Sequence, residues 1–182
     1  MFVEGVYAPV RELGKLKTVI DLGALYGEFS FYVQDMVDKI YAIEPLPPAY
    51  IELEENCDRF ENITPYKFCI TNENKDRYIE GLADGGAHTK FDVRKTTTPT
   101  YKVEGRTLAT FMKENGIEHV DALKIDIENH EKYVFNAEDF HEVAPKIDFI
   151  IGEHLGDKNL RKLLESYGFK YEKYSHGSIY RR

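Results

Sequence analysis

The sequence predicts an α/β fold in which helices cover both faces of a mainly parallel β-sheet. The main observation is that short apolar runs of strand length alternate with segments whose apolar residues recur at helical spacing. A second observation is that the chain closes on two strand-like pieces around a glycine, which is typical of a hairpin. With 182 residues, of which 42% are hydrophobic, the chain has the size and composition of one domain with a sizeable core.

In the first half of the chain, predicted strands and helices alternate. Residues 17–22 form a short apolar run that predicts a buried strand, and a helical stripe of apolar residues begins after Glu28. A second strand is predicted at residues 39–43, and two prolines then open a helix. The third strand covers residues 63–70, and Pro65 indicates that its first half lies at an edge of the sheet or outside the ladder.

The middle segment, residues 71–100, lacks a clear period. Two adjacent glycines and a run of three threonines interrupt it, and its pattern predicts no more than short strands or a hairpin. We regard it as a candidate lid or insertion, because loops between regular elements commonly carry specificity.

Regular structure is predicted again from residue 101 to the end. The predicted strands are apolar runs at residues 101–103, 120–127 and 146–151. The predicted helices cover residues 108–115, about 128–135 and about 158–167. Thr107 and Asp157 are the expected N-caps of the first and last of these helices, and Gly168 ends the last one. Residues 169–182 predict a closing hairpin.

The net charge and the cysteine content indicate which partners and which thiol state to expect. The net charge of −8 repels nucleic-acid phosphates and anionic membranes, so neither is the expected partner. Cys57 and Cys69 are the only cysteines, and two buried reduced thiols are favoured over a disulfide between them. No signal peptide and no apolar run of membrane-spanning length is evident, which favours a cytoplasmic protein.

The segment after the first predicted strand carries the first candidate site. Gly23 and Gly27 allow a tight turn and a close approach of the backbone to a ligand. The segment lacks the dinucleotide pattern G-x-G-x-x-G, because Leu25 and Glu28 occupy the other glycine positions. A carboxylate at the helix entrance also suits a pyrophosphate poorly. The alternative is a strand-to-helix turn that binds no ligand.

Glu44 ends the second predicted strand, about 20 residues beyond the glycine turn, where an acidic residue can accept hydrogen bonds from both ribose hydroxyls. Taken alone, Glu44 is equally consistent with an exposed carboxylate at a strand end. Together with the glycine turn it favours a nucleoside without a pyrophosphate, and S-adenosylmethionine is the commonest cofactor of this kind.

Three blocks of the sequence resemble the FkbM family of S-adenosylmethionine-dependent methyltransferases. They are residues 19–27 (VIDLGALYG), 41–45 (YAIEP) and 120–128 (VDALKIDIE). The resemblance extends over about residues 17–170 and implies a single Rossmann-like class I methyltransferase domain over residues 1–182, with an antiparallel final strand. It also implies that Glu44 holds the ribose. The residues that it places around the methionine part of the cofactor are Asp21, Gly23, Ala24, Tyr26, Gly27 and Glu28.

Two positions depart from the family pattern. Leu25 stands where the family usually has asparagine, so one polar contact near the cofactor is in doubt. Asn129 stands where the family has glycine, and asparagine is the other residue that tolerates a left-handed backbone well.

The third block places Lys124, Asp126 and Glu128 at alternate positions of one strand, on one face. One interpretation is a lysine–carboxylate pair that steadies the end of the sheet. The other places Asp126 and Glu128 beside the acceptor, where methyl transfer depends on positioning and a hydroxyl acceptor benefits from a base. His154 is the preferred base, because it follows a strand and adjoins Glu153. His88 and His130 are weaker candidates.

The same residues offer oxygen and imidazole ligands for a hard divalent cation such as magnesium or manganese. The candidate ligands are Asp126, Glu128, Glu153 and His154. Their spacing is not diagnostic, so a metal is possible and none is assigned.

The resemblance implies O-methylation of a small hydroxylated molecule such as a sugar or glycoconjugate, which is a fold-level expectation. An RNA methyltransferase is one alternative, although the negative charge and the lack of an Asn-Pro-Pro-Tyr or Asp-Pro-Pro-Tyr motif disfavour it. A non-catalytic nucleoside-binding or scaffold protein is another. The broken glycine pattern disfavours a nicotinamide-dependent oxidoreductase.

Overall fold

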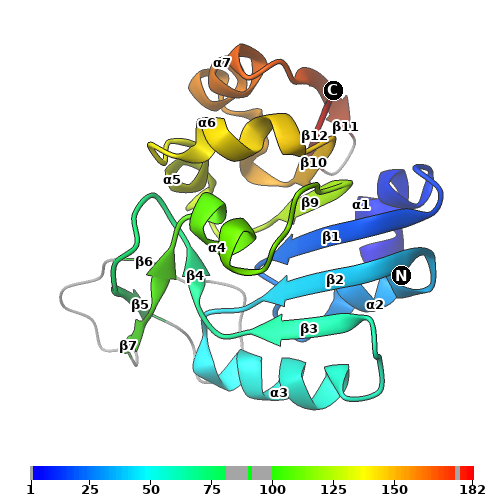
Figure 1. The fold of residues 1–182 in the computed structure, drawn as a ribbon, viewed down its shortest axis with the longest axis vertical. Coiled ribbons are helices and arrows are strands. Elements are labelled where there is room, and N and C mark those ends of the chain that lie inside the picture. The colour runs from blue at the N-terminus through cyan, green and yellow to red at the C-terminus, as the bar shows by residue number, and fades with distance from the viewer. Residues whose placement is uncertain (1, 81–89, 92–99, 175–176) are drawn as a thin grey trace.

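A computed structural model describes residues 2–80, 90–91, 100–174 and 177–182, with only the backbone of residues 2–4, 90–91 and 154. Its centre is a seven-stranded sheet with the strand order β11-β12-β10-β9-β1-β2-β3 (Figure 1). The strands are β1 (Leu16–Leu22), β2 (Val37–Ile43), β3 (Ile63–Tyr66), β9 (Ala122–Ile125), β10 (Phe149–Gly152), β11 (Lys170–Tyr174) and β12 (Gly177–Arg181). β12 is antiparallel to both of its neighbours, and the pairs from β10 to β3 are parallel. The predicted sheet with an antiparallel final strand is confirmed.

Helices cover both faces of this sheet. One group is α1 (Phe2–Arg11), α2 (Glu28–Val33), the 3₁₀ turn η1 (Gln34–Met36) and α3 (Pro47–Cys57). The other is α4 (Leu108–Glu114), α5 (Glu131–Phe135), α6 (Phe140–Val143), α7 (Lys158–Ser166) and the 3₁₀ turns η2 (Ala144–Lys146) and η3 (His154–Gly156). Val19 of β1 packs with the first group and Ile20 with the second, as the period of two in a strand requires. The sheet therefore separates two apolar cores.

Two small sheets lie beyond the carboxyl ends of β1, β2 and β3, where the arrowheads point in Figure 1. One is the parallel pair β4 (Cys69–Ile70) and β8 (Gly105–Arg106). The other places β5 (Arg77–Glu80) between β6 (Lys90–Phe91) and β7 (Thr100–Val103), antiparallel to both. The segment 71–100 thus contributes strands next to the edge of the main sheet where ligands bind in such folds.

Several boundaries differ from the prediction. The predicted strand 63–70 divides into β3, which is an edge strand as Pro65 indicated, and β4, which leaves the main sheet to pair with β8. The predicted strand 120–127 is regular only as β9, because the chain turns away at Asp126. Thr107 caps α4 through a hydrogen bond from the Thr110 N–H, as expected.

The sequence analysis predicted no helix at the position of α1. It contains Pro9, yet it is held against the sheet by Val6 and Val10, which are 6% and 0% exposed. The Arg11 guanidinium at its end forms two hydrogen bonds, of 2.7 and 2.9 Å, with the carboxylate of Asp35. Packing on the sheet thus outweighs the cost of an internal proline.

Both cysteines are buried and free, which agrees with the prediction of two thiols. Among the described residues, no helix has the length and apolar character required to cross a membrane.

Candidate cofactor and acceptor site

The carboxyl ends of β1, β2 and β9 meet at one edge of the sheet. β1 lies between β2 and β9 and is parallel to both, so the loops that follow the three strands are neighbours. These loops, residues 23–27, 44–46 and 126–130, hold most of the predicted site residues. The fold therefore brings together the three sequence blocks on which the functional prediction depends.

Gly23 lies where two of these loops touch. Its φ is 77°, and its N–H donates a hydrogen bond to the carbonyl of Ile43 at the end of β2, 3.0 Å away. A Cβ atom at this position would lie 1.9 Å from the backbone carbonyl oxygen of Asp126. Only glycine allows both the left-handed turn and this approach.

Glu44 is a buried carboxylate, 5% exposed, that holds the glycine turn from the other side. Its Oε2 accepts a hydrogen bond from the N–H of Leu25 (3.0 Å), and its Oε1 accepts one from the N–H of Leu46 (2.8 Å). Burial raises the pKa of this carboxyl to about 6, although both amide donors act to lower it. Each oxygen keeps acceptor capacity for a further donor such as a ribose hydroxyl.

An apolar cluster adjoins Glu44, and its exposed apolar surface comes from the partly buried residues packed against it. It joins Leu46 and Ala49 to Ile79 of β5, which is fully buried, and Leu25 and Tyr26 pack against it while remaining partly exposed. The small sheet β6-β5-β7 thus forms part of the wall of this region. The described part of the 71–100 segment lies beside the predicted nucleoside site.

The predicted residue Asp21 is completely buried at the end of β1. Its Oδ2 accepts a hydrogen bond of 2.8 Å from the hydroxyl of Ser30, and its Oδ1 lies 3.0 Å from the Nζ of Lys124 in an ion pair. The lysine is therefore paired with a carboxylate, as one interpretation of the sequence predicted, but with a carboxylate of β1. The carboxylate of Asp21 thus binds groups of the protein itself, Ser30 and Lys124.

The other predicted residues of the turn lie in different environments. Ala24 is buried and donates its N–H to the carbonyl of Ile43 (3.1 Å). Gly27 has φ 96° and precedes α2, where a Cβ would lie 2.4 Å from the ring of Phe31. Glu28 begins α2 with an exposed side chain.

The loop after β9 contains the predicted acceptor residues Asp126 and Glu128, both partly buried. Glu128 and Asn129 are consecutive non-glycine residues with φ of 55° and 68°. Glu131, itself buried, accepts a hydrogen bond from the N–H of Ile127 (3.1 Å) and closes the loop. Non-glycine residues in this region carry strain that the surrounding structure must hold in place.

The histidines predicted as bases have different outcomes. His154 begins η3 directly after Glu153, and its imidazole lies outside the described atoms. His88 lies outside the described residues. His130 is buried, its Nε2 lies 3.0 Å from the hydroxyl oxygen of Thr71, and its ring stacks on Tyr133 with the centroids 4.5 Å apart.

Tyr7 of α1 lies near Lys124 at the candidate site, a position that the motifs did not reveal. It is 8% exposed, and its ring centroid lies 6.0 Å from the Nζ of Lys124. Burial raises its pKa to about 12, and Asp126 and Asp21 contribute in the same direction, so the phenol remains neutral. The signal that could have found it is the helical spacing of Val6, Tyr7 and Val10.

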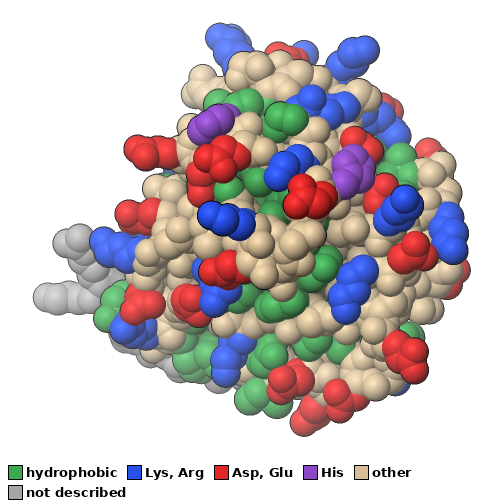
Figure 2. All heavy atoms as spheres, viewed as in Figure 1, with side chains coloured by type: hydrophobic (Ala, Val, Ile, Leu, Met, Phe, Trp, Pro, Cys, Tyr) green, Lys and Arg blue, Asp and Glu red, His purple; other side chains and the backbone are tan. Residues whose placement is uncertain are grey.

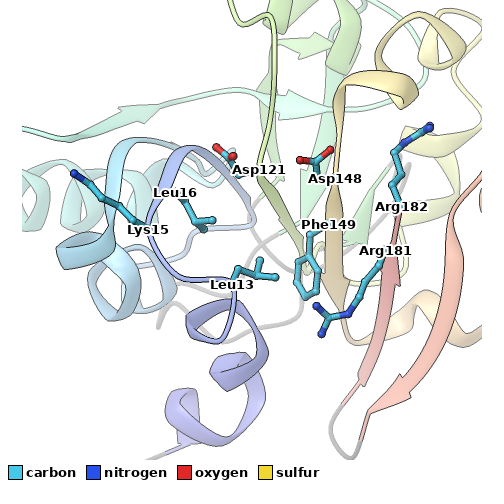
Figure 3. Close-up of a pocket in the computed structure, with 8 residues that line it drawn as sticks. All are labelled: Leu13, Lys15, Leu16, Asp121, Asp148, Phe149, Arg181 and Arg182. Carbon is cyan, nitrogen blue, oxygen red and sulfur yellow. The ribbon is translucent and has the colours of Figure 1, made fainter.

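Metal binding at the predicted position gains no support from the described side chains. Among these, the one group of three potential ligands within 4.8 Å of one another is His119, Asp121 and Asp148. Asp121 directly precedes β9 and Asp148 precedes β10, so the group lies at the amino ends of the strands, opposite the predicted site. Both carboxylates line a groove of about 510 Å³ (Figure 3).

Comparison with known proteins supports the resemblance. The model of the Methyltransferase FkbM domain family matches residues 21–171, which is most of the chain. No curated protein sequence matches the chain significantly.

Several solved structures share the fold at low sequence identity. Precorrin-6y C5,15-methyltransferase from Geobacter metallireducens is 15% identical, with a TM-score of 0.54 over 98% of this chain and 85% of that one. An rRNA methylase from Streptococcus thermophilus is 9% identical, with a TM-score of 0.54 over 97% and 93%. Aeropyrum pernix fibrillarin, solved with natively bound S-adenosylmethionine, is 13% identical, with a TM-score of 0.52 over 92% and 66%. The chain therefore belongs to the FkbM methyltransferase family and forms an S-adenosylmethionine-dependent methyltransferase domain.

Proposed function

We propose that this domain, over residues 1–182, transfers the methyl group of S-adenosylmethionine to a hydroxyl oxygen of a small molecule such as a sugar or glycoconjugate. The observation that carries the proposal is the strained loop after β9, where Glu128 and Asn129 are consecutively left-handed. Such strain persists at functional sites because it places groups that chemistry needs. Asp126 and Glu128 belong to this loop, and the backbone of Asp126 lies against the turn after β1 at Gly23.

The residues around Glu44 fit the cofactor. Glu44 would accept hydrogen bonds from the ribose hydroxyls, since both of its oxygens retain acceptor capacity after binding one amide each. The partly exposed residues at the edge of the apolar cluster beside Glu44 would pack against the adenine ring. The turn at residues 23–27 would hold the methionine part, with Glu28 at its outer end. When bound, the cofactor supplies an electrophilic methyl group on a sulfonium.

The protein's own contribution is positioning and proton handling. Asp126 and Glu128 would orient the acceptor hydroxyl by accepting its hydrogen bond. His154 is the proposed base that takes the hydroxyl proton as the new oxygen–carbon bond forms. The neighbouring carboxylates would stabilise the resulting imidazolium.

The segment 71–100 is proposed to act as a lid or insertion that contributes to acceptor choice. This assignment is supported by Ile79, which is completely buried in the apolar cluster beside Glu44. No metal is assigned to the reaction.

The first test is calorimetric titration of the protein with S-adenosylmethionine and S-adenosylhomocysteine, with NADH as the negative control. Binding that weakens strongly in Glu44→Ala supports the placement of the nucleoside. The second test is methyl transfer from labelled cofactor to panels of hydroxylated sugars, amines and carbon nucleophiles. Turnover confined to amines or carbon nucleophiles would overturn the proposed O-methylation.

An RNA acceptor is the second candidate, because an rRNA methylase is among the proteins of similar fold. The net charge of −8 disfavours it, and on the face drawn in Figure 2 basic and acidic side chains of the described residues are mixed. Tight tRNA binding with a steep salt dependence would favour RNA instead. Cofactor binding without turnover on any acceptor would favour a scaffold protein.

A further inference from the structure

The side chain of Lys124 is 4% exposed, and its ammonium forms polar contacts with β1 and with the turn that follows. The Nζ lies 2.6 Å from the carbonyl oxygen of Gly23 and 3.3 Å from that of Leu22, and it donates to both. It forms the ion pair with Asp21 at 3.0 Å. One cation on β9 therefore holds three acceptors, two on the neighbouring strand β1 and one in the turn that follows it.

We propose that Lys124 is a positioning residue for the end of the site that receives the amino-acid part of the cofactor. It fixes the carbonyl of Gly23 and the carboxylate of Asp21, and so determines the course of the glycine turn. The inference rests on the proposed placement of the cofactor. It adds Lys124 to the proposed site and assigns Lys124 and Glu44 to different parts of the ligand.

Stability alone is a poor reason for a buried ion pair at this place. Removing two charges from water costs several kcal/mol per ion, and well-packed apolar residues in their place are often as stable or more so. The Lys124–Asp21 pair replaces what could be an apolar contact between two central strands. A directional role in setting the backbone of Gly23 accounts for it.

The surroundings keep Lys124 charged. Burial lowers the pKa of its ammonium, but the nearby negative charge, above all that of the Asp21 carboxylate, raises the pKa above its ordinary value. The charge of Lys124 also acts to lower the pKa of Glu44 after β2, and the charge of Asp21 acts to raise the pKa of Cys57 of α3.

Two charged side chains anchor the glycine turn, one at its first residue and one at its middle. Lys124 holds the carbonyl of Gly23, whereas Glu44 holds the N–H of Leu25. Glu44 also faces the proposed ribose site. The two anchors should therefore affect different parts of the ligand, Glu44 the nucleoside and Lys124 the amino-acid part.

The test compares two ligands that differ only in the amino-acid part. Calorimetry on the full chain measures the affinity of wild type and Lys124→Met for S-adenosylhomocysteine and for 5′-methylthioadenosine. We expect Lys124→Met to weaken S-adenosylhomocysteine on the order of tenfold, the effect of one lost charge-assisted contact, with less than about a twofold change for 5′-methylthioadenosine. Lys17→Met, an exposed lysine on β1, is the matched control and should change neither affinity.

A second variant keeps the test valid if the single substitution unfolds the protein. Lys124→Met combined with Asp21→Asn removes both charges, so no unpaired carboxylate remains buried, and its melting temperature should exceed that of Lys124→Met. A positioning role predicts that the selective loss of S-adenosylhomocysteine affinity persists in this double variant. Rescue of that affinity together with stability would overturn the inference.

The outcomes separate the inference from the proposed function. Equal losses for both ligands, or no loss for either, contradict the positioning role while the cofactor assignment stands. A wild-type protein that binds neither ligand overturns both.

Discussion

The backbone carbonyl oxygen of Asp126 lies 1.9 Å from the position that a Cβ atom on Gly23 would occupy. The backbones of Gly23 and Asp126 therefore pack closely against each other. This packing joins the turn after β1 to the loop after β9, and so couples the proposed cofactor and acceptor sides. Neither partner is a flexible side-chain end, so the contact has little room to adjust.

Gly23→Ala should therefore destabilise the protein by at least about 2 kcal/mol, because left-handed strain and a backbone displacement add together. S-adenosylhomocysteine binding should also be lost. Chemical denaturation and calorimetry measure the two effects. Gly116→Ala is the matched control, because Gly116 has φ 63° with nothing within 4 Å of a Cβ. Equal destabilisation of both variants would show that the contact with Asp126 has no energetic role.

The buried carboxyl of Glu44 predicts a pH dependence of folding. Its pKa is about 6 in the folded protein against an ordinary value of 4.5, so the native state favours the protonated form. Glu44 then stabilises the fold most below about pH 4.5, and this contribution, about 2 kcal/mol, is lost as pH rises to about 6. The difference in unfolding free energy between wild type and Glu44→Gln, measured by urea denaturation from pH 4 to 7, should show this slope.

Cofactor affinity should depend on pH in the opposite direction. Ribose hydroxyls donate to the ionised carboxylate, so S-adenosylhomocysteine should bind more tightly as pH rises through about 6. Calorimetry between pH 5 and 7.5 measures this trend. Glu44→Gln should remove it, and an unchanged trend in that variant would assign the titration to another group.

Asn129 has φ 68° and an exposed side chain, so its backbone conformation matters more than its contacts. Asn129→Gly should leave stability within about 0.5 kcal/mol of wild type, because glycine adopts this conformation without strain. Asn129→Val should cost about 1–3 kcal/mol, since a β-branched residue is strained there. Both variants lose the amide, so their difference in thermal or chemical unfolding isolates the backbone effect. Similar stabilities would contradict a left-handed residue 129.

The contact between His130 and Thr71 connects the loop after β9 to the end of β4. A double-mutant cycle of His130→Phe and Thr71→Val, measured by chemical denaturation, should give a coupling energy of about 1 kcal/mol. The phenyl ring retains the stacking on Tyr133, and valine retains the shape of threonine. Strictly additive effects would mean that this hydrogen bond does not couple the two loops.

The sequence predicted the frame of the fold through local signals. The apolar runs located the parallel strands, Pro65 indicated an edge position, and Thr107 and Asp157 marked helix starts that the structure confirms. These signals work because strand burial, proline's missing donor and N-capping act within a few residues. These local signals gave no information where a strand pairs with a segment far away along the chain. β4 was predicted as part of one long strand because its pairing with β8 depends on residues 105–106.

The candidate site divides in the same way. Glycine spacing, Glu44 and the block at residues 120–128 identified the three loops from the sequence, since such patterns are short and local. The orientation of each side chain required the assembled sheet. Lys124 was grouped with Asp126 and Glu128 by strand alternation, whereas β9 ends at Ile125 and the lysine contacts Asp21 across the sheet.

The sequence by itself thus determined the fold class, the family and the strand ends that carry the candidate site. Only the tertiary structure decided that Glu44 is buried and bonded to two amides, that Lys124 pairs with Asp21, and that α1 places Tyr7 against the site. The physical reason is distance along the chain. Apolar period and turn chemistry are read within one element, but burial and ion pairing depend on which strands become neighbours.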